Sequence, residues 1–516
     1  MHICPSVSAL LFSSLQQLFP PTGLADTYCN ILQHAKGFGE KVILPEHAAY
    51  SKSIQSHFAV NAQLQPACIV QPRSAGDVAL TVKTLTAPAQ PCQFAVRSGG
   101  HTTWPGAAGI ENGVTVDLSA MNRTVYNKNA GTASILPGSR WQQVYETLEP
   151  YGVTVAGGRG GSVGVGGFLI GGGNTLYAAR VGFACDNVEN FQVVLASGEI
   201  VNANKTAHSD LYKALKGGSI NFGIVTRYDV TTLPHDTLWG GMVVYDNSTT
   251  PQHIDAAHDF INNFHKDPFA SWIGMWHYSS AIGVNMIVSP IHYTKPQAYP
   301  PALDDFVRIP NITDTVRFAG TWNMTQELVQ PEGHRDIFVT ATFVNRKEAL
   351  QRAVTVHNEI LEEAKAQVKS QYWSMITMLQ PWPTLFAEQS AKRGGNVLGL
   401  ERFDQNLFRE SALVFVPLYL GLTMPEVLFD YSWDDEDDDA LFRRLAASAL
   451  ERLSTYARSI EADNEYVYLN YADQTQNPLR GYGDENVEYM RRVARGYDPR
   501  GVFQHQVPGG FKVSAA

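Results

Sequence analysis

The hydrophobic pattern of the chain changes near residue 235. Between residues 60 and 235, short runs rich in Val and Ile, such as ACIVQP, QFAVRS, GVTVDLS and FQVVLASGEIV, alternate with helix-like stretches such as SAGDVALTVKTL and RWQQVYETLEPYG. This alternation is typical of small sheets joined by helices. It predicts an α+β or α/β domain over 1–235 with its core at 60–235, including a strand at 94–97.

From residue 236 onward the apolar runs are longer and richer in aromatic residues. WGGMVVYD, WIGMWHYS, DIFVTATFV and ALVFVPLYL read as strands, and the segments near 347–368 and 440–460 have the period of amphipathic helices. We predict a second domain over 236–464, an antiparallel sheet covered by helices on one face. Residues 465–516 are rich in Tyr, Asn, Gly and Pro, have little helix potential, and are expected to return to the first domain.

Composition narrows the class of protein. The 516 residues are 44% hydrophobic and 17% charged, which is the balance of a folded protein of two or three domains. The net charge of -10 gives no basic field for nucleic acid or an anionic membrane. No apolar run reaches the length of a membrane span. The acidic run DDEDDD at 434–439 is interpreted as a solvated loop that leads into a helix.

The cysteines and the N-glycosylation sequons provide evidence on metal binding, disulfide bonds and the cellular compartment of the protein. The five cysteines include no C-x-x-C pair, so neither a zinc site nor a disulfide scaffold is expected, and no metal is predicted. Our candidate disulfide joins Cys29 to Cys92, the alternative being that all five are small buried residues. The first 20 residues lack the basic region of a secretory signal. Glycosylation sequons favour the secretory pathway over the cytoplasm; they lie at Asn122, Asn204, Asn247, Asn311 and Asn323.

A glycine-rich segment carries the strongest functional signal. Residues 157–173 read GGRGGSVGVGGFLIGGG, in which ten of seventeen positions are Gly. Such density is retained where backbone must adopt positive φ or approach a ligand closely, and a pyrophosphate held by backbone N–H groups is a common such ligand. A flexible linker would carry Ser in place of these Val, Phe, Leu and Ile residues. Neither G-x-G-x-x-G nor a P-loop motif is present here, so the cradle is of another kind.

Two further glycine turns lie in the same region. RSGGHT follows the strand predicted at 94–97 and presents His101 directly after two glycines. LKGGSINFGIVT at 215–226 is the third turn. A histidine after a tight turn is usually structural, but three glycine turns in one α+β domain favour a cofactor site.

These motifs together resemble a known family. ACIVQPRSAGDV, FAVRSGGH, GVTVDLS, SVGVGGFLIGGG, VLASGEIV, INFGIVT, YLNYAD and YDPRGVF, in this order, are similar to the berberine-bridge-enzyme-like FAD oxidases of the vanillyl-alcohol-oxidase flavoprotein family, especially those of fungal secondary metabolism. The similarity is dense over 60–230 and clear over 465–513. It implies a two-subdomain FAD domain and a substrate domain whose antiparallel sheet covers the flavin.

The resemblance assigns roles to particular residues. His101 falls where such enzymes link an imidazole to the C8 methyl of FAD, and Gly160 stands where many relatives carry a second, cysteinyl link, so we expect a single covalent bond. Val163 occupies a position that leaves room for dioxygen in oxidases. Tyr468 and Tyr471 are candidate catalytic bases, with Asn470 beside them.

The remaining predicted contacts are with the cofactor. The predicted pyrophosphate, adenosine and ring contacts are Arg97, Ser98, Gly99, Gly100, Gly166, Gly167, Gly171, Gly172, Gly173, Gly182, Asp186, Val188, Gly223 and Ile224. His277, Glu401 and His334 lie near predicted strand ends and are interpreted as structural.

We therefore predict a monomeric FAD-dependent oxidase that transfers a hydride from a small organic substrate, an alcohol, amine or phenol-derived metabolite, and passes the electrons to O2. A carbohydrate oxidase of the same fold and a non-redox flavoprotein, either a cyclase or a binding protein, are the alternatives. The sequence contains no motif that identifies the substrate.

Overall fold

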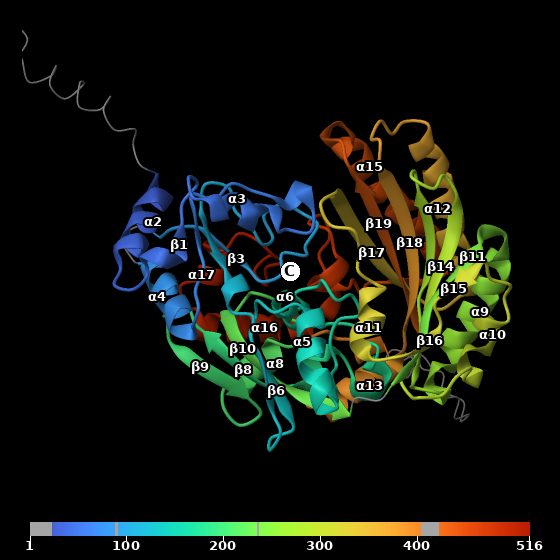
Figure 1. Cartoon of the computed structure of the whole chain (residues 1–516), viewed down its shortest axis with the longest axis horizontal. Coiled ribbons are helices and arrows are strands. Elements are labelled where there is room, and N and C mark those ends of the chain that lie inside the picture. The colour runs from blue at the N-terminus through green and yellow to red at the C-terminus, as the bar shows by residue number, and fades with distance from the viewer. Residues whose placement is uncertain (1–22, 88–90, 235–236, 404–422) are drawn as a thin grey trace, which may run out of the picture.

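A computed structural model describes residues 23–87, 91–234, 237–403 and 423–516, and contains three sheets (Figure 1). The first, four-stranded sheet lies near the N-terminus. Its strands in spatial order are β1 (Val42–Ile43), β2 (Cys68–Val70), β4 (Val114–Asp117) and β3 (Phe94–Arg97). Strands β2, β4 and β3 are parallel to one another, β1 is antiparallel to β2, and α4 (Ala75–Leu85) and α2 (Leu24–His34) pack against the sheet. The strand predicted at 94–97 is confirmed.

The second sheet is antiparallel and follows in the chain. Its strands are β5 (Thr124–Asn127), β6 (Thr132–Ile135), β10 (Ile224–Pro234), β8 (Val188–Val194) and β9 (Ile200–Asn204), with β7 (Val153–Val155) paired to β10. The helices around it are α5 (Trp141–Leu148), α6 (Val165–Ile170), α7 (Ala178–Val181) and α8 (Ser209–Ala214). The glycine-rich segment therefore contains a short helix, α6, whose Val165 and Leu169 are fully buried.

The third sheet is large and antiparallel, as predicted. Its strands in spatial order are β15 (Thr313–Asp314), β11 (Leu238–Asp246), β14 (Asn285–Tyr293), β13 (Gly274–Ser279), β18 (Trp373–Trp382), β19 (Met424–Trp433), β17 (Arg335–Phe343) and β20 (Asp463–Asn464). Two short strands lie off this order: β12 (Ala270–Trp272) pairs with β14, and β16 (Arg317–Ala319) pairs with β11. The predicted strand ALVFVPLYL lies outside the described residues.

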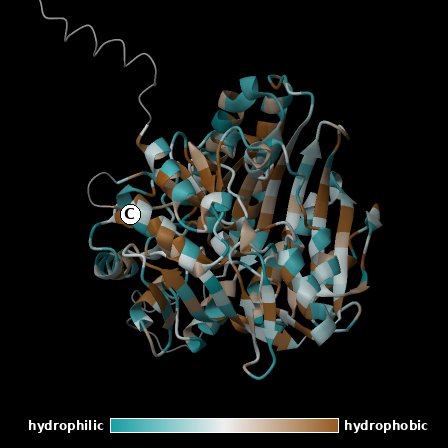
Figure 2. Ribbon diagram, turned by 60° about the vertical axis from the view of Figure 1, so that its left-hand side comes forward, coloured by the Kyte–Doolittle hydropathy of each residue, from teal (hydrophilic) through white to brown (hydrophobic). Residues whose placement is uncertain are grey.

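Helices cover one face of the large sheet. They are α9 (Thr250–Asn263), α10 (Asp304–Val307), α12 (Lys347–Lys365) and α15 (Asp439–Ser459); Figure 1 shows α9, α10 and α12 on the side away from the first two sheets, and α15 packs against α12. The smaller helices α11 (Thr321–Gln326) and α13 (Thr384–Lys392) lie between the two halves. Figure 2 shows hydrophobic and hydrophilic residues mixed along the helices of the molecule, and in α12 and α15 the buried residues recur at the spacing of amphipathic helices. The uncovered face of the sheet looks toward the first two sheets.

The C-terminal segment packs against the first sheet and the turns near it. The Phe94 N–H donates to the Gln506 carbonyl at 2.8 Å, and the Asn221 amide donates to the Phe511 carbonyl at 2.9 Å. The expectation of little helix here was wrong, because α16 (Asp484–Tyr497) and α17 (Val502–His505) lie in this segment. In α16, buried apolar residues recur at helical spacing beneath a heavily charged outer face, a pattern that the surrounding Gly and Pro obscured.

The disulfide prediction was wrong in its partner. Cys29 on α2 is bonded to Cys68 on β2, with a Cα–Cα distance of 6.1 Å, whereas Cys92 is buried and free. Because α2 packs beside β1 and β2, its cysteine faces that side of the sheet. Burial raises the pKa of the Cys92 thiol to about 11, so it stays protonated.

We expect Cys68→Ser to lower the stability of the folded protein substantially. The disulfide closes a loop with a sequence separation of 39 residues, for which loop-closure entropy corresponds to about 3 to 4 kcal/mol. The measurement is the melting temperature with and without a reductant. In the matched variant Cys92→Ser, reductant should still lower the melting temperature; if it had no effect there, the bond would join Cys29 to Cys92.

The acidic run is less solvated than predicted. Asp438 is buried and accepts hydrogen bonds from the backbone N–H groups of Lys369 and Ser370, and Asp439 pairs with Arg335. The run does lead into α15, as expected. None of the helices among the described residues is long and apolar enough to cross a membrane.

Candidate active site

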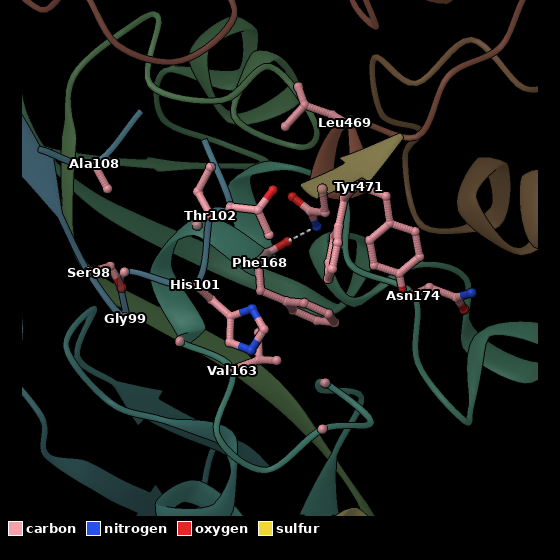
Figure 3. A pocket seen from close by; sticks show the side chains of 18 of the residues that line it. Ser98, Gly99, His101, Thr102, Ala108, Val163, Phe168, Asn174, Leu469 and Tyr471 are labelled. Carbon is pink, nitrogen blue, oxygen red and sulfur yellow. Dashed lines mark hydrogen bonds between the residues drawn. The ribbon is translucent and has the colours of Figure 1, made fainter. Parts of the chain in front are cut away.

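A cavity of about 450 Å³ lies between the uncovered face of the large sheet and the glycine turns of the first half. This volume is in the range of small-molecule and cofactor sites. Side chains from three separate parts of the chain enter it: His101 and Phe168 from the first half, strand residues of the large sheet, and Tyr471 from the C-terminal segment (Figure 3).

The structure brings together twelve of the nineteen predicted site residues. Those that line the cavity are Ser98, Gly99, Gly100, His101, Val163, Gly166, Gly167, Gly223, Ile224, Tyr468, Asn470 and Tyr471. Those that do not are Arg97, Gly171, Gly172, Gly173, Gly182, Asp186 and Val188.

Two glycine turns meet directly beneath the cavity. A Cβ atom added to Gly99 would stand 2.4 Å from the Gly164 Cα, and one added to Gly164 would stand 2.5 Å from the Gly99 Cα. Since real Cβ atoms do not approach backbone so closely, both positions require glycine. The turn RSGGHT and the segment 157–173 therefore form one backbone cradle, and Ser98 joins them further by accepting from the Gly166 N–H at 3.1 Å.

The predicted residues away from the cavity have other contacts. The Arg97 guanidinium donates to the Ser53 carbonyl and lies 4.0 Å from Asp117, both buried. Asp186 accepts from the Phe183 N–H at 2.8 Å and from Ser390, which fixes a turn. Their cofactor roles stay predictions.

The remaining glycines of this group serve close packing. A Cβ at Gly171 would stand 1.9 Å from the Asn470 side-chain oxygen. Glycine at this position therefore allows the YLNYAD segment to pack closely against the glycine-rich segment. Gly172 and Gly173 have positive φ angles, as does Gly182, and Val188 is fully buried.

His101 is held in the form that a nucleophile requires. Its ring stacks on Phe58, with centroids 4.2 Å apart and an interplanar angle of 9°. Burial, with a smaller contribution from the Arg140 charge, lowers the pKa of His101 to about 4. The imidazole is therefore neutral near pH 7, and a neutral imidazole has a free nitrogen lone pair.

The two candidate tyrosine bases differ in their hydrogen bonds. The Tyr468 hydroxyl accepts from the Asn174 N–H at 2.8 Å and from the Asn470 amide at 3.1 Å, and burial raises its pKa well above the usual range. The same Asn470 amide donates to the Phe168 carbonyl at 3.1 Å, the dashed line in Figure 3. Tyr468 is thus tied to its surroundings.

Tyr471 instead contacts a cation. The Arg159 guanidinium donates to the Tyr471 hydroxyl at 3.2 Å. Burial raises the pKa of Tyr471, and the Arg159 charge acts in the opposite direction. Of the two tyrosines, Tyr471 is the one whose phenolate would be stabilised by a neighbouring positive charge.

Sequence reasoning missed the polar network behind Tyr471. The same Arg159 group donates to the Gln380 side-chain oxygen at 2.7 Å, and the Gln380 amide donates to the Glu426 carboxyl at 2.5 Å. Glu426 also accepts from the Thr340 hydroxyl at 3.1 Å. Burial raises the pKa of Glu426 to about 8, so the carboxyl is mostly protonated at pH 7. The available signal was the presence of Gln380 and Glu426 in two otherwise mostly apolar strands, β18 and β19.

Gly160 and Val163 lie at the same end of the cavity as His101. A Cβ at Gly160 would stand 3.1 Å from the Leu328 carbonyl oxygen and 3.5 Å from a methyl group of Val163. The described free cysteines, Cys92 and Cys185, do not line the cavity.

The strands of the large sheet present mostly apolar side chains to the cavity. They are Met242, Met275, His277, Val288, Phe338, Ile376, Met378 and Leu428. His277 lies in the middle of β13 and lines the cavity, whereas Glu401 and His334 do not. The His334 ring instead hydrogen-bonds to Asp434 at 2.6 Å.

Among the described residues, no group of three or more His, Cys, Asp or Glu side chains is arranged to hold a metal ion.

Comparisons with known proteins agree with this geometry. A family model described as an FAD binding domain matches residues 66–204. The FAD-dependent monooxygenase sdcF of Emericella nidulans is 48% identical over 480 residues, covering 93% of this chain and 97% of that protein. The FAD-dependent monooxygenase drtC of Aspergillus calidoustus is 41% identical over 479 residues, covering 92% of this chain and 88% of that protein.

Solved structures with the same fold are more distant in sequence. Glucooligosaccharide oxidase from Acremonium strictum, with a 6-S-cysteinyl, 8α-N1-histidyl FAD, superposes with a TM-score of 0.71 at 19% identity, covering 93% of this chain and 98% of that one. 6-Hydroxy-D-nicotine oxidase from Arthrobacter nicotinovorans has a TM-score of 0.71 at 17% identity, covering 90% and 96%. At these identities the similarity establishes the fold.

Proposed function

Because this chain belongs to the berberine-bridge-enzyme-like FAD-linked oxidoreductases of the vanillyl-alcohol-oxidase family, we propose that it is an oxidase that holds FAD covalently through His101. The substrate is a small organic molecule and the electron acceptor is O2. The observation that carries the proposal is the placement of a neutral His101 and an arginine-paired Tyr471 on one cavity.

The residues present fit an FAD molecule. The joined glycine turns at Gly99 and Gly164 leave backbone, without side chains, at the cavity surface, which suits a pyrophosphate. Apolar residues such as Ile220 and Ile224 line the part of the cavity that would hold the adenosine, and His101 lies near the part that would hold the flavin ring. The predicted contacts that do not line the cavity are proposed to support the glycine turns from behind. They are Arg97, Gly171, Gly172, Gly173, Gly182, Asp186 and Val188.

Each residue at the reacting end has a separate task. When bound, FAD supplies hydride acceptance and the reduction of O2 to hydrogen peroxide. His101 tethers the cofactor through its free ring nitrogen, and the Phe58 ring keeps the imidazole in one orientation. Tyr471 removes the proton from the substrate hydroxyl or amine, and Arg159 stabilises the phenolate that this requires.

Glu426 and Gln380 position Arg159. Below its pKa of about 8 the Glu426 carboxyl is protonated and does not compete for the Arg159 charge, whereas the ionised carboxylate raises the pKa of Tyr471. The Gln380 side-chain oxygen fixes the guanidinium by accepting a hydrogen bond from one of its N–H groups. Asn470 and Tyr468 hold the YLNYAD segment against Phe168 and keep Tyr471 in the cavity.

The test is anaerobic mixing of the purified protein with candidate alcohols, amines and phenols. A substrate should bleach the flavin absorbance without O2, and admission of O2 should restore the colour with one hydrogen peroxide per reduced flavin. Peroxide in the absence of substrate, or no bleaching by any compound, would contradict the oxidase proposal.

A second candidate, a monooxygenase, follows from the names of the relatives that share 48% and 41% of their residues with this chain. The two reactions differ in the fate of O2. Turnover under 18O2 followed by mass spectrometry of the product distinguishes them, since a monooxygenase places one labelled oxygen atom in the product and an oxidase places none.

We expect Val163→Leu to slow flavin reoxidation by O2 while leaving anaerobic flavin reduction unchanged. Val163 lines the cavity beside Gly160, and an added methylene there would fill space that O2 would use. The measurement is stopped-flow mixing of reduced protein with oxygenated buffer, and a drop of about tenfold corresponds to a barrier increase of roughly 1.4 kcal/mol. An equal drop in both half-reactions would instead indicate a general distortion of the site.

The predicted domain boundaries at 235 and 464, the monomeric state and a route through the secretory pathway also belong to this proposal. The Cys29–Cys68 disulfide and the exposed sequons at Asn122 and Asn311 support the secretory route.

A further inference from the structure

The wall of the cavity formed by the large sheet is mostly apolar. Directly paired residues of an antiparallel sheet share one face, and pairing connects Val288, Met275, Met378 and Leu428 in one row across β14, β13, β18 and β19. Three strand spacings of roughly 4.8 Å make this row about 14 Å wide, enough for two or three fused rings.

His277 interrupts this surface. It lies in the next row, where it pairs with Ile376, and it alternates along β13 with Trp276 and Tyr278, which are buried on the helix side. Within the part of the chain that the structure describes, no group hydrogen-bonds to the His277 ring. Asp430 continues the same row; its carboxylate is buried and accepts a hydrogen bond from the Gln330 side-chain amide.

From this surface we infer that the substrate is a planar, apolar aromatic compound that lies on Met275, Met378 and Ile376 and hydrogen-bonds through one oxygen to His277. The inference deepens the proposed function, since it names the substrate class of the same site. Methionine sulfurs make favourable contacts with aromatic rings, and their flexible side chains adapt to ring outlines.

The same surface disfavours a sugar. A carbohydrate presents several hydroxyl groups, and each hydroxyl left without a partner on a buried apolar wall costs binding free energy. The wall offers one imidazole, whose pKa is lowered by burial and which is therefore neutral and able to donate or accept one hydrogen bond. This argument separates the chain from the carbohydrate oxidases that share its fold.

The test is equilibrium dialysis of the purified flavoprotein against 2-naphthol, 2-methylnaphthalene and cellobiose. We expect 2-naphthol to bind more tightly than 2-methylnaphthalene, and cellobiose not to bind. His277→Leu should weaken 2-naphthol binding by about three- to tenfold, the range of one net hydrogen bond, with 2-methylnaphthalene unchanged. His277→Gln should restore part of the loss, because an amide donates and accepts.

Two further variants keep the test decisive. Met378→Asn should weaken both naphthalenes even if His277→Leu fails to fold, and His334→Leu, outside the cavity, should weaken neither. Tighter binding of cellobiose than of 2-naphthol, or an equal loss of both naphthalenes in His277→Leu, would overturn the inference. Because dialysis involves no turnover, failure of peroxide formation with binding intact would reject the oxidase reaction and leave the substrate class standing.

Discussion

His101→Ala is expected to release all of the flavin when the protein is denatured. In the parent protein the yellow colour should stay with the acid-precipitated pellet, because we propose that the neutral His101 ring carries the covalent bond. No second bond should remain in the variant, since Gly160 has no thiol and neither described free cysteine lines the cavity. The measurement is flavin absorbance in the pellet and in the supernatant.

Two variants sharpen this result. His334→Ala removes a histidine outside the cavity and should leave all flavin in the pellet. Phe58→Ala removes the ring that stacks on His101 and should give incomplete attachment, visible as flavin divided between pellet and supernatant. Flavin retained in the His101→Ala pellet would mean that another residue forms a covalent bond.

Tyr471→Phe is expected to slow anaerobic flavin reduction by a factor of about 10² to 10⁴, the contribution typical of a positioned general base. The ring and its edge contact with Phe338 remain, so the loss isolates the hydroxyl. The measurement is stopped-flow bleaching of the flavin by a substrate found in the anaerobic screen. The matched variant Tyr468→Phe removes a hydroxyl that only accepts from Asn174 and Asn470, and its effect should be much smaller.

The pH dependence provides a check on the role of Arg159. In the proposed mechanism the active form of Tyr471 is the phenolate, so the rate of flavin reduction should rise as pH increases toward the pKa of Tyr471. Since the Arg159 charge lowers that pKa, Arg159→Gln should move the rise to higher pH. An unmoved profile, or equal losses in Tyr471→Phe and Tyr468→Phe, would remove Tyr471 from the role of base.

Local patterns predicted much of this fold because they report local physics. Alternating apolar runs identified β3, β11 and β17, and the helical period identified α12 and α15. The same reasoning failed for α16, where flanking Gly and Pro outweighed an amphipathic pattern. It also failed for the partner of Cys29, because the choice between Cys68 and Cys92 depends on which side of the first sheet α2 covers.

The sequence by itself determined the family and the FAD cofactor, because the motifs that carry the resemblance, such as the glycine turns and the C-terminal YLNYAD, are local patterns of residues. Only the tertiary structure decided which residues share the cavity. In the folded chain, Arg97 and Asp186 hydrogen-bond to neighbouring backbone groups and do not line the cavity. Arg159 contacts Tyr471, which lies 312 residues away in the sequence. The tertiary structure also placed His277 on the wall of the cavity. Such distances depend on how three sheets pack, and no short stretch of sequence contains that information.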